Sequence, residues 1–168
     1  YAAAILPEIR KMGLQLILEP GRYIIGNAAL LLSRVTYVKS GWHGRKFAIL
    51  DAAMNDLIRP AMYDSHHDIW PVRGAPPPRL AKSRRGIRTE VMDIVGPICE
   101  TSDCFAKDRR LPPLQEADIV AIFSAGAYGM SMSSNYNSRP RACEVMVSGR
   151  NVRVIRKRET FKDIVRGE

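Results

Sequence analysis

The chain carries four short groups of charged, thiol and aromatic side chains, placed where apolar segments end. The first is Glu19-Pro20-Gly21-Arg22, which follows the apolar residues 16–18. Proline cannot donate a ladder hydrogen bond and glycine adopts backbone angles that other residues avoid, so the chain must turn here. The small Gly21 lets a ligand approach backbone N–H groups, and the Arg22 guanidinium is a two-pronged donor. The turn therefore suits an anion, although an ordinary charged turn has the same sequence.

Three further groups combine residue types that recognise carboxylates and amines or transfer protons. Arg59-Pro60-Ala61-Met62-Tyr63 places an arginine and a tyrosine on one side of any helical turn. Cys99-Glu100-Thr101-Ser102-Asp103 puts a thiol beside two carboxylates. Gly126-Ala127-Tyr128-Gly129 frames a tyrosine with glycines, so that backbone can pass close to a ligand. Each group also has a structural interpretation: a surface pair, a buried small thiol and a core tyrosine.

The first 28 residues have the pattern of one helix–strand unit. Residues 1–11 have apolar side chains at helical spacing, and Gly13 is a typical helix end. Residues 15–18 form a continuous apolar run, which is typical of a buried parallel strand. Such a unit cannot bury both faces of its strand alone. Because the chain opens on Tyr1 in mid-pattern, we expect residues 1–28 to be the last unit of a repeating α/β architecture cut from a longer chain.

Residues 29–168 change to short strands separated by turn residues. Strands are predicted at 30–39, 46–52, 69–72, 90–98 and 118–124, and a hairpin at 142–147 and 151–156. Residues 54–63 are predicted as a turn-rich connection and residues 103–114 as a loop. A short helix is expected from Thr160 to Val165, with Thr160 as its cap. The pattern predicts a mainly β fold, an antiparallel β-sandwich or barrel, over residues 29–168.

The net charge of +9 raises the possibility of a polyanion partner. The excess lies in the Pro-rich stretch 73–88 and in the stretch 150–158, which also fit a solvated loop and a solvated hairpin. Aromatic residues do not interleave with these charges, as single-strand binding requires, so a basic β domain that binds nucleic acid is kept only as an alternative.

Cysteine count and hydropathy limit the other classes. Cys99, Cys104 and Cys143 are too few and too irregular for a disulfide framework or, with the adjacent His66 and His67, for a zinc site. Neither a signal-peptide pattern nor an apolar run of roughly 18 residues occurs. We therefore expect no metal, no membrane span and a cytoplasmic location.

Taken in order, the four groups resemble the diaminopimelate decarboxylase family, pyridoxal-phosphate enzymes of the alanine-racemase-like fold. The motifs are Glu19-Pro20-Gly21-Arg22, Arg59-Pro60-Ala61-Met62-Tyr63, Val95-Gly96-Pro97-Ile98-Cys99-Glu100-Thr101-Ser102-Asp103 and Ala125-Gly126-Ala127-Tyr128-Gly129. The resemblance covers nearly the whole chain and is weakest in residues 73–88. The related ornithine and arginine decarboxylases remain an alternative, but ornithine decarboxylases carry Cys-Asp where this chain has Cys99-Glu100.

The resemblance implies that pyridoxal 5'-phosphate is the cofactor and that four residues contact it. Gly21 would help to hold the phosphate, and Glu19 would lie near the cofactor ring. Arg22 and Tyr128 complete the implied cofactor-binding set. The cofactor would be the electron sink for decarboxylation of meso-2,6-diaminopimelate to L-lysine and CO₂, a step of lysine biosynthesis.

The same resemblance implies a substrate-binding set. Arg22 and Arg59 would grip a substrate carboxylate, which fits bidentate recognition by guanidinium groups. Tyr63 would add a hydroxyl donor, and Tyr128 would contact the substrate as well as the cofactor. Glu100 would take the distal ammonium group of the substrate.

Cys99 is implied as the catalytic residue, the proton donor to the carbon that loses CO₂. In the family, Cys99 and Glu100 reach the active site of the partner subunit, so a homodimer with shared active sites is implied. The family's cofactor lysine lies in an N-terminal (β/α)₈ barrel, and Lys11, Lys39 and Lys46 do not match it. We therefore expect this chain to be the C-terminal segment of such an enzyme and to be inactive alone.

Overall fold

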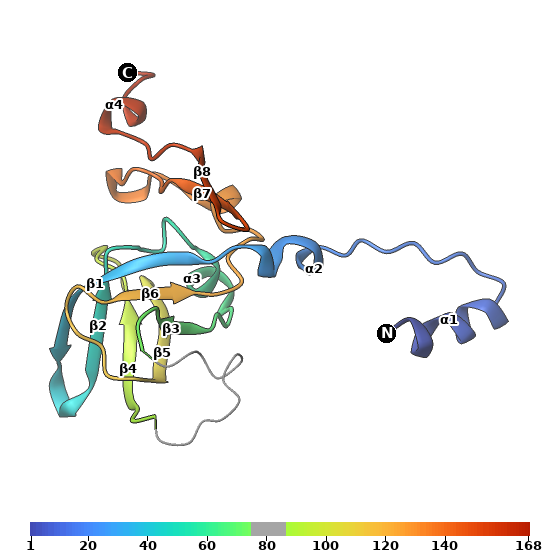
Figure 1. Cartoon of the computed structure of the whole chain (residues 1–168), viewed down its shortest axis with the longest axis horizontal. Helices are drawn as coiled ribbons and strands as arrows, with labels where there is room; N and C mark the ends of the chain where they lie inside the picture. Colours follow the sequence, from blue (N-terminus) through green and yellow to red (C-terminus); the bar gives the residue numbers. More distant parts are fainter. Residues whose placement is uncertain (75–86) are drawn as a thin grey trace.

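The computed structural model describes residues 1–74 and 87–168 and shows a mainly β molecule built on one six-stranded sheet (Figure 1). The strand order is β3-β6-β1-β2-β4-β5. The strands are β1 (Leu31–Ser40), β2 (Lys46–Leu50), β3 (Ile69–Pro71), β4 (Glu90–Val95), β5 (Cys104–Leu111) and β6 (Ile119–Ile122). The predicted mainly β architecture is confirmed, with a barrel-like sheet.

The sheet is mixed rather than purely antiparallel, which corrects one detail of the prediction. Strand β1 pairs antiparallel with β2 and β6, and β4 pairs antiparallel with β5. Strands β2 and β4, however, are parallel, with Ala48 opposite Ile94. A parallel pair needs a long crossover, and residues 51–89, which include α3 (Arg59–Tyr63) and β3, supply it.

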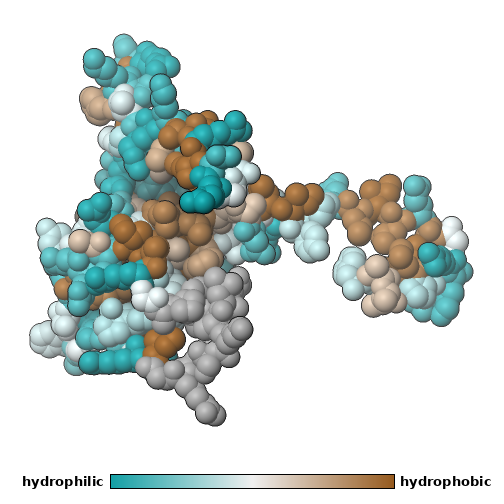
Figure 2. Space-filling model, in the orientation of Figure 1, coloured by the Kyte–Doolittle hydropathy of each residue, from teal (hydrophilic) through white to brown (hydrophobic). Residues whose placement is uncertain are grey.

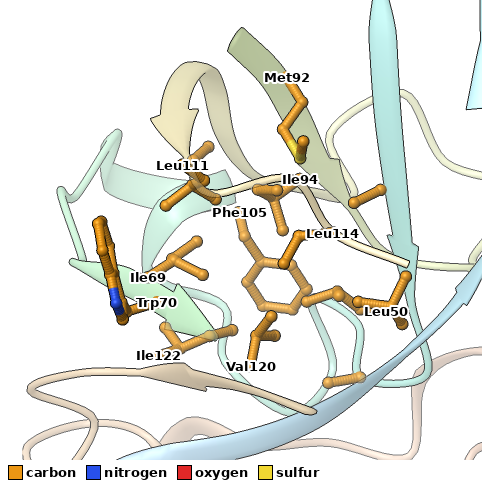
Figure 3. Packing of buried hydrophobic residues seen from close by; sticks show 14 of the residues in the cluster. Leu50, Ile69, Trp70, Met92, Ile94, Phe105, Leu111, Leu114, Val120 and Ile122 are labelled. Carbon is orange, nitrogen blue, oxygen red and sulfur yellow. The ribbon is translucent and has the colours of Figure 1, made fainter. Parts of the chain in front are cut away.

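The hydrophobic core lies on the inner face of this sheet and draws on all six strands (Figure 3). Val35, Leu50, Ile94 and Ile122 are fully buried there. These branched side chains suit a pleated surface that is covered on one face. The core fixes the strand ends, from which the segments with the four motifs depart.

Strand β5 falls in residues 103–114, which were predicted as a loop, so that prediction was wrong. Phe105, Ala106 and Leu111 are buried, but the alternation between them is broken. Asp108 has a positive φ of 48°, and the pairing of β4 with β5 shifts register between Met92 and Ile94. A bulge puts an extra residue into a strand, and here it hides the two-residue period that would have identified β5.

The N-terminal segment forms its predicted helix but not its predicted strand. Helix α1 (Ala2–Lys11) is followed by Gly13 with φ of 64°, as expected. Residues 14–20 form no strand, and the Ile17 side chain is 80% exposed. In Figure 1 this segment runs out from the sheet as an extended arm. A buried parallel strand needs neighbours on both sides, and the described residues provide none; that residues 1–28 belong to a barrel stays a prediction.

The remaining short elements connect the sheet to its surroundings. They are α2 (Arg22–Ile25), η1 (Gly26–Ala28), η2 (Trp42–Gly44), η3 (Met130–Met132), η4 (Tyr136–Ser138) and α4 (Phe161–Ile164). The predicted cap of the last helix is confirmed, because Thr160 and Asp163 form a reciprocal capping box. No helix within residues 1–74 and 87–168 is long and apolar enough to cross a membrane.

The predicted hairpin is confirmed as β7 (Glu144–Ser148) and β8 (Asn151–Arg156). Its register places Val145 opposite Val154 and Val147 opposite Val152. Residues two apart share a face of a strand, so these four side chains form one face, which we call the valine face. All four are exposed, and Figure 2 shows apolar side chains at the surface in this part of the molecule.

The basic stretches have different outcomes. Of the stretch 73–88, residues 75–86 lie outside the described residues; Arg73 pairs with Asp118 at 2.5 Å. In the stretch 150–158, the Arg156 guanidinium donates to the Glu144 carboxylate across the hairpin at 2.6 Å. This ion pair across the two strands fits the interpretation of residues 150–158 as part of a solvated hairpin.

Replacing Ile122 with alanine should destabilise the fold by about 2–5 kcal/mol, because it leaves a cavity in the core. Ile122 is fully buried in β6 and pairs with both Leu31 and Ile69. Urea denaturation measures the change. The matched control is Val152→Ala on the exposed hairpin, which should change the free energy of unfolding by less than about 0.5 kcal/mol. Equal losses for the two variants would contradict this account of the core.

Candidate functional site

The Pro-Gly turn forms as predicted, and residues 25–27, which follow it, lie against the glycine-rich loop after β6. Gly21 has a positive φ of 51°, which a glycine accommodates without strain. After this turn, the Gly126 N–H donates to the Gly26 carbonyl at 3.1 Å, and the Ser124 hydroxyl donates to Asn27 Oδ1 at 2.7 Å. A side chain at Gly126 would collide with the Ile25 carbonyl oxygen. The segment that follows the Pro-Gly turn is thus held against a loop about a hundred residues further along the chain.

The Arg59 guanidinium lies close to two tyrosine rings that come from different motifs. Helix α3 places its guanidinium carbon 5.7 Å from the centre of the Tyr63 ring, which confirms that these two residues share one side of a turn. The same carbon lies 5.4 Å from the centre of the Tyr128 ring. Such cation–π contacts orient a guanidinium, while one of its nitrogens donates to the Ser65 hydroxyl at 3.1 Å.

Tyr128 itself adopts a backbone conformation that is unusual for a bulky residue. Its φ is 60°, in the left-handed region. Strained residues of this kind concentrate at functional sites, where the surrounding structure holds them. Gly129, the next residue, has no room for a side chain because the Ala125 carbonyl oxygen fills that space. The glycines that frame Tyr128 therefore serve the loop that presents it.

A hollow of about 370 Å³ opens between the Pro-Gly turn, α3 and the end of β6. Its lining residues are mostly polar or cationic: Pro20, Arg22, Tyr23, Gly26, Asn27, Arg59, His66, His67 and Ser124. Two guanidinium groups at one hollow favour an anionic ligand. The sequence did not identify Asn27, Ser124, His66 or His67 as lining residues; His66 and His67 stood out only as an adjacent pair.

His67 is the buried member of this lining. The side chain is 4% exposed, and Nδ1–H donates to the Phe123 carbonyl at 2.8 Å. Burial lowers the pKa of His67, and the nearby Arg59 and Arg22 lower it further, although the hydrogen bond to Phe123 opposes the change. His67 is therefore neutral at pH 7 and fixes the position of residue 123, just before Ser124.

Cys99 and Glu100 belong to a second group, at the turn between β4 and β5. The Glu100 carboxylate accepts hydrogen bonds from the Ser102 hydroxyl at 3.1 Å and from the Ser102 N–H at 3.2 Å. The Tyr136 hydroxyl approaches it at 3.5 Å. The bonds from Ser102, followed by the one from Tyr136, lower the pKa of Glu100, so this exposed carboxylate is ionised at neutral pH. The Cys99 thiol is free and exposed.

The structure thus forms two groups from the predicted site residues. It brings Arg22, Arg59, Tyr63 and Tyr128 together around or beside the hollow. Glu19 and Gly21 lie in the adjoining turn without lining it. The hydrogen bonds of Glu100 run to Ser102 and Tyr136 instead. Within the described parts of the chain, no cluster of His, Cys, Asp and Glu could hold a metal ion.

The first group fits a cofactor that carries a phosphate. Arg22 and Arg59 supply positive charge, and Asn27 and Ser124 supply polar side chains. Amide, hydroxyl and guanidinium donors are those that bind phosphate and carboxylate oxygens. The charge and the donors of this lining therefore suit an anionic ligand.

A family model described as "Pyridoxal-dependent decarboxylase, C-terminal sheet domain" matches residues 22–126. The match spans more than half of the chain and contains all six strands of the main sheet. The chain belongs to the pyridoxal-dependent decarboxylase family and contains its C-terminal sheet domain.

Within this family, the chain is similar to diaminopimelate decarboxylases. A diaminopimelate decarboxylase of Pseudomonas aeruginosa is 51% identical over 168 residues, which are all of this chain and 38% of that protein. One from Methanothermobacter thermautotrophicus is 50% identical over 151 residues, which are 90% of this chain and 33% of that protein. The chain therefore spans little more than a third of the length of these relatives.

Solved structures agree with these relatives. A diaminopimelate decarboxylase from M. jannaschii superposes with a TM-score of 0.85 at 38% identity, covering 99% of this chain and 37% of that one. The enzyme from Helicobacter pylori, in complex with L-lysine, gives 0.81 at 40% identity, covering 99% and 38%. An arginine decarboxylase at 18% identity and a TM-score of 0.66 shares the fold.

His67 should make the stability of the fold fall as the pH is lowered. Because its folded pKa lies below the unfolded value of about 6.5, only the unfolded chain gains a proton as the pH passes 6.5. Stability present above pH 6.5 is then lost by up to about 1.4 kcal/mol per pH unit. His67→Gln, which keeps a donor but cannot titrate there, should lose less stability between pH 7.5 and 5.

Urea denaturation of both proteins at the two pH values measures the difference. His43→Gln is the control, since it removes an exposed histidine and should leave the pH dependence as in the wild type. An unchanged pH dependence in His67→Gln would show that His67 is not the responsible group.

Proposed function

We propose that this chain is the substrate-recognition part of a pyridoxal-phosphate-dependent diaminopimelate decarboxylase, which converts meso-2,6-diaminopimelate to L-lysine and CO₂. The observation that carries the proposal is the Arg59 guanidinium carbon 5.7 Å and 5.4 Å from the centres of the Tyr63 and Tyr128 rings, in a hollow that Arg22 also lines. The two diaminopimelate decarboxylases that are 51% and 50% identical to this chain support it. A dimer and a cytoplasmic location are part of the proposal.

In this proposal, the residues of the first group bind and orient the cofactor and the substrate. Gly21 and Arg22 would hold the phosphate of the cofactor, and Glu19 and Tyr128 would lie near its ring. When bound, pyridoxal phosphate supplies an electron sink for the bond to be broken. Arg59, with Arg22, grips a carboxylate of the substrate through its planar fork, and Tyr63 donates its hydroxyl. Because two rings already orient Arg59, little side-chain entropy is lost on binding.

The second group recognises the far end of the substrate. Glu100 is ionised and exposed, which suits a distal ammonium group. Cys99, next to it, donates a proton to the carbon that has lost CO₂. Since this group makes its hydrogen bonds away from the Arg59 group, we propose that it completes the active site of a partner subunit.

The lysine that binds the cofactor covalently comes from a barrel outside this chain in the proposed enzyme. Lys11 pairs with Glu8 at 2.8 Å on α1, and Lys46 pairs with Glu90 between β2 and β4. Lys39, in β1, lies 5.4 Å from the centre of the Tyr37 ring. None of these three lysines contacts the hollow.

The 168-residue chain, supplied with pyridoxal phosphate, should therefore not form lysine from meso-diaminopimelate. The full-length protein that contains it together with a barrel should do so. Lysine and CO₂ release are measured with diaminopimelate, ornithine and arginine as substrates. Turnover by the chain alone would contradict the proposal that a barrel outside this chain is needed for activity. Preference of the full-length protein for ornithine or arginine would contradict the assignment of diaminopimelate as the substrate.

In the full-length enzyme, Arg59→Lys should lower kcat/KM by about 10- to 100-fold. Lysine keeps the charge but loses the fork and the stacking on two rings. Steady-state kinetics measure the change. Arg34→Lys, an exposed change on β1, is the control and should behave as the wild type. Equal kinetics of Arg59→Lys and Arg34→Lys would remove Arg59 from the site.

A further inference from the structure

The Asp103 side chain links two separate segments of backbone. It is only 4% exposed. Oδ1 accepts the Met54 N–H at 2.7 Å, and Oδ2 accepts the Ile98 N–H at 2.8 Å. One carboxylate thus joins the turn after β4 to the segment that leads into α3 and Arg59.

The turn that Asp103 closes is the one that presents Cys99 and Glu100. The Gly96 N–H donates to the Asp103 carbonyl at 3.0 Å, and the Asp103 N–H donates to the Glu100 carbonyl at 3.0 Å. The Glu100 N–H donates to the Ile98 carbonyl at 2.8 Å. The backbone and the side chain of Asp103 therefore hold both ends of the turn, while Cys99 and Glu100 stay exposed at its tip.

Gly96 is required by this carboxylate rather than by its own backbone. Its φ lies outside the left-handed region, so other residues could adopt it. A side chain at position 96 would, however, overlap the Asp103 carboxylate. The glycine of the third motif is therefore explained by close packing of Asp103 against the start of the turn.

Asp118 offers a close comparison elsewhere in the fold. It is equally buried, at 5%, and also accepts a backbone N–H, from Gln115 at 2.9 Å. Asp118 closes the turn before β6 and is paired with Arg73, away from Cys99 and Glu100. Replacement of either aspartate removes a buried carboxylate, but only Asp103 belongs to the turn of the second group.

We infer that Asp103 is a positioning residue, which sets Cys99 and Glu100 by fixing their turn to the Met54 segment. The inference rests on the proposed function, because it concerns the roles given there to Cys99 and Glu100. An asparagine at 103 can accept one of the two N–H groups, but its amide nitrogen would face the other. The turn should then be released at one end, while the rest of the sheet stays intact.

The test is a double-mutant cycle in the full-length enzyme with Asp103→Asn, Asp118→Asn and Glu100→Gln. Asp103→Asn should lower kcat/KM for diaminopimelate by about 10- to 100-fold, since small misplacement of reacting groups is costly. In that background, Glu100→Gln should cost only a few-fold more. In the wild-type and Asp118→Asn backgrounds, Glu100→Gln should lower kcat/KM by the same, larger factor.

A full cost of Glu100→Gln in the Asp103→Asn background would overturn the inference, because Glu100 would then still be in place. Absence of diaminopimelate turnover in the wild-type enzyme would instead overturn the proposed function. Hydrogen exchange of the full-length protein gives a readout that needs no activity: Asp103→Asn should speed exchange at Ile98, Glu100 and Ser102, whereas Asp118→Asn should not. Unchanged exchange at all three amides would also overturn the inference.

Gly96→Ala offers a second route to the same displacement. Gly96→Ala should lower kcat/KM as Asp103→Asn does. In an Asp103→Ala background it should lower kcat/KM little further, because the carboxylate with which the new methyl group would collide is absent. Additive losses would show that Gly96 acts independently of Asp103.

Discussion

The candidate site depends on the hydrogen bonds that continue the pairing of β1 and β6 beyond the ends of both strands. Leu31 and Ile122 form the last residue pair between these two strands. Past this point the Ala125 N–H still reaches the Ala29 carbonyl at 3.0 Å, and the Gly126 N–H reaches Gly26. Through these bonds the sheet holds the segment after the Pro-Gly turn against the tyrosine loop, so the core also supports the geometry of the candidate site.

The two groups of site residues have different supports. Arg59 is oriented by aromatic rings from two segments, a contact that tolerates some sliding of one ring over the charge. The Glu100 turn is instead fixed by backbone hydrogen bonds and by one buried carboxylate, which are directional. In the proposed function, carboxylate recognition by Arg59 therefore depends on adaptable contacts, and the turn with Cys99 and Glu100 depends on directional ones.

The sequence predicted most strands and all four motifs because both leave local signals: apolar runs, Pro-Gly pairs and residues at helical spacing. Strand β5 was missed because a bulge at Asp108 disrupts its alternation. The predicted strand at residues 15–18 was wrong for the described chain, since burial needs neighbours that local sequence cannot supply. His67 and Asp103 were given no role, because their partners are backbone groups distant in sequence.

The valine face and the net charge of the chain have opposite effects on its self-association. With a net charge of +9, copies of the chain repel each other at low ionic strength. Salt screens this repulsion over distances beyond about 10 Å, while salts such as sulfate strengthen apolar association. Four exposed valines on a two-stranded ribbon then favour self-association. At low ionic strength the repulsion between copies that each carry a charge of +9 therefore opposes association through the valine face.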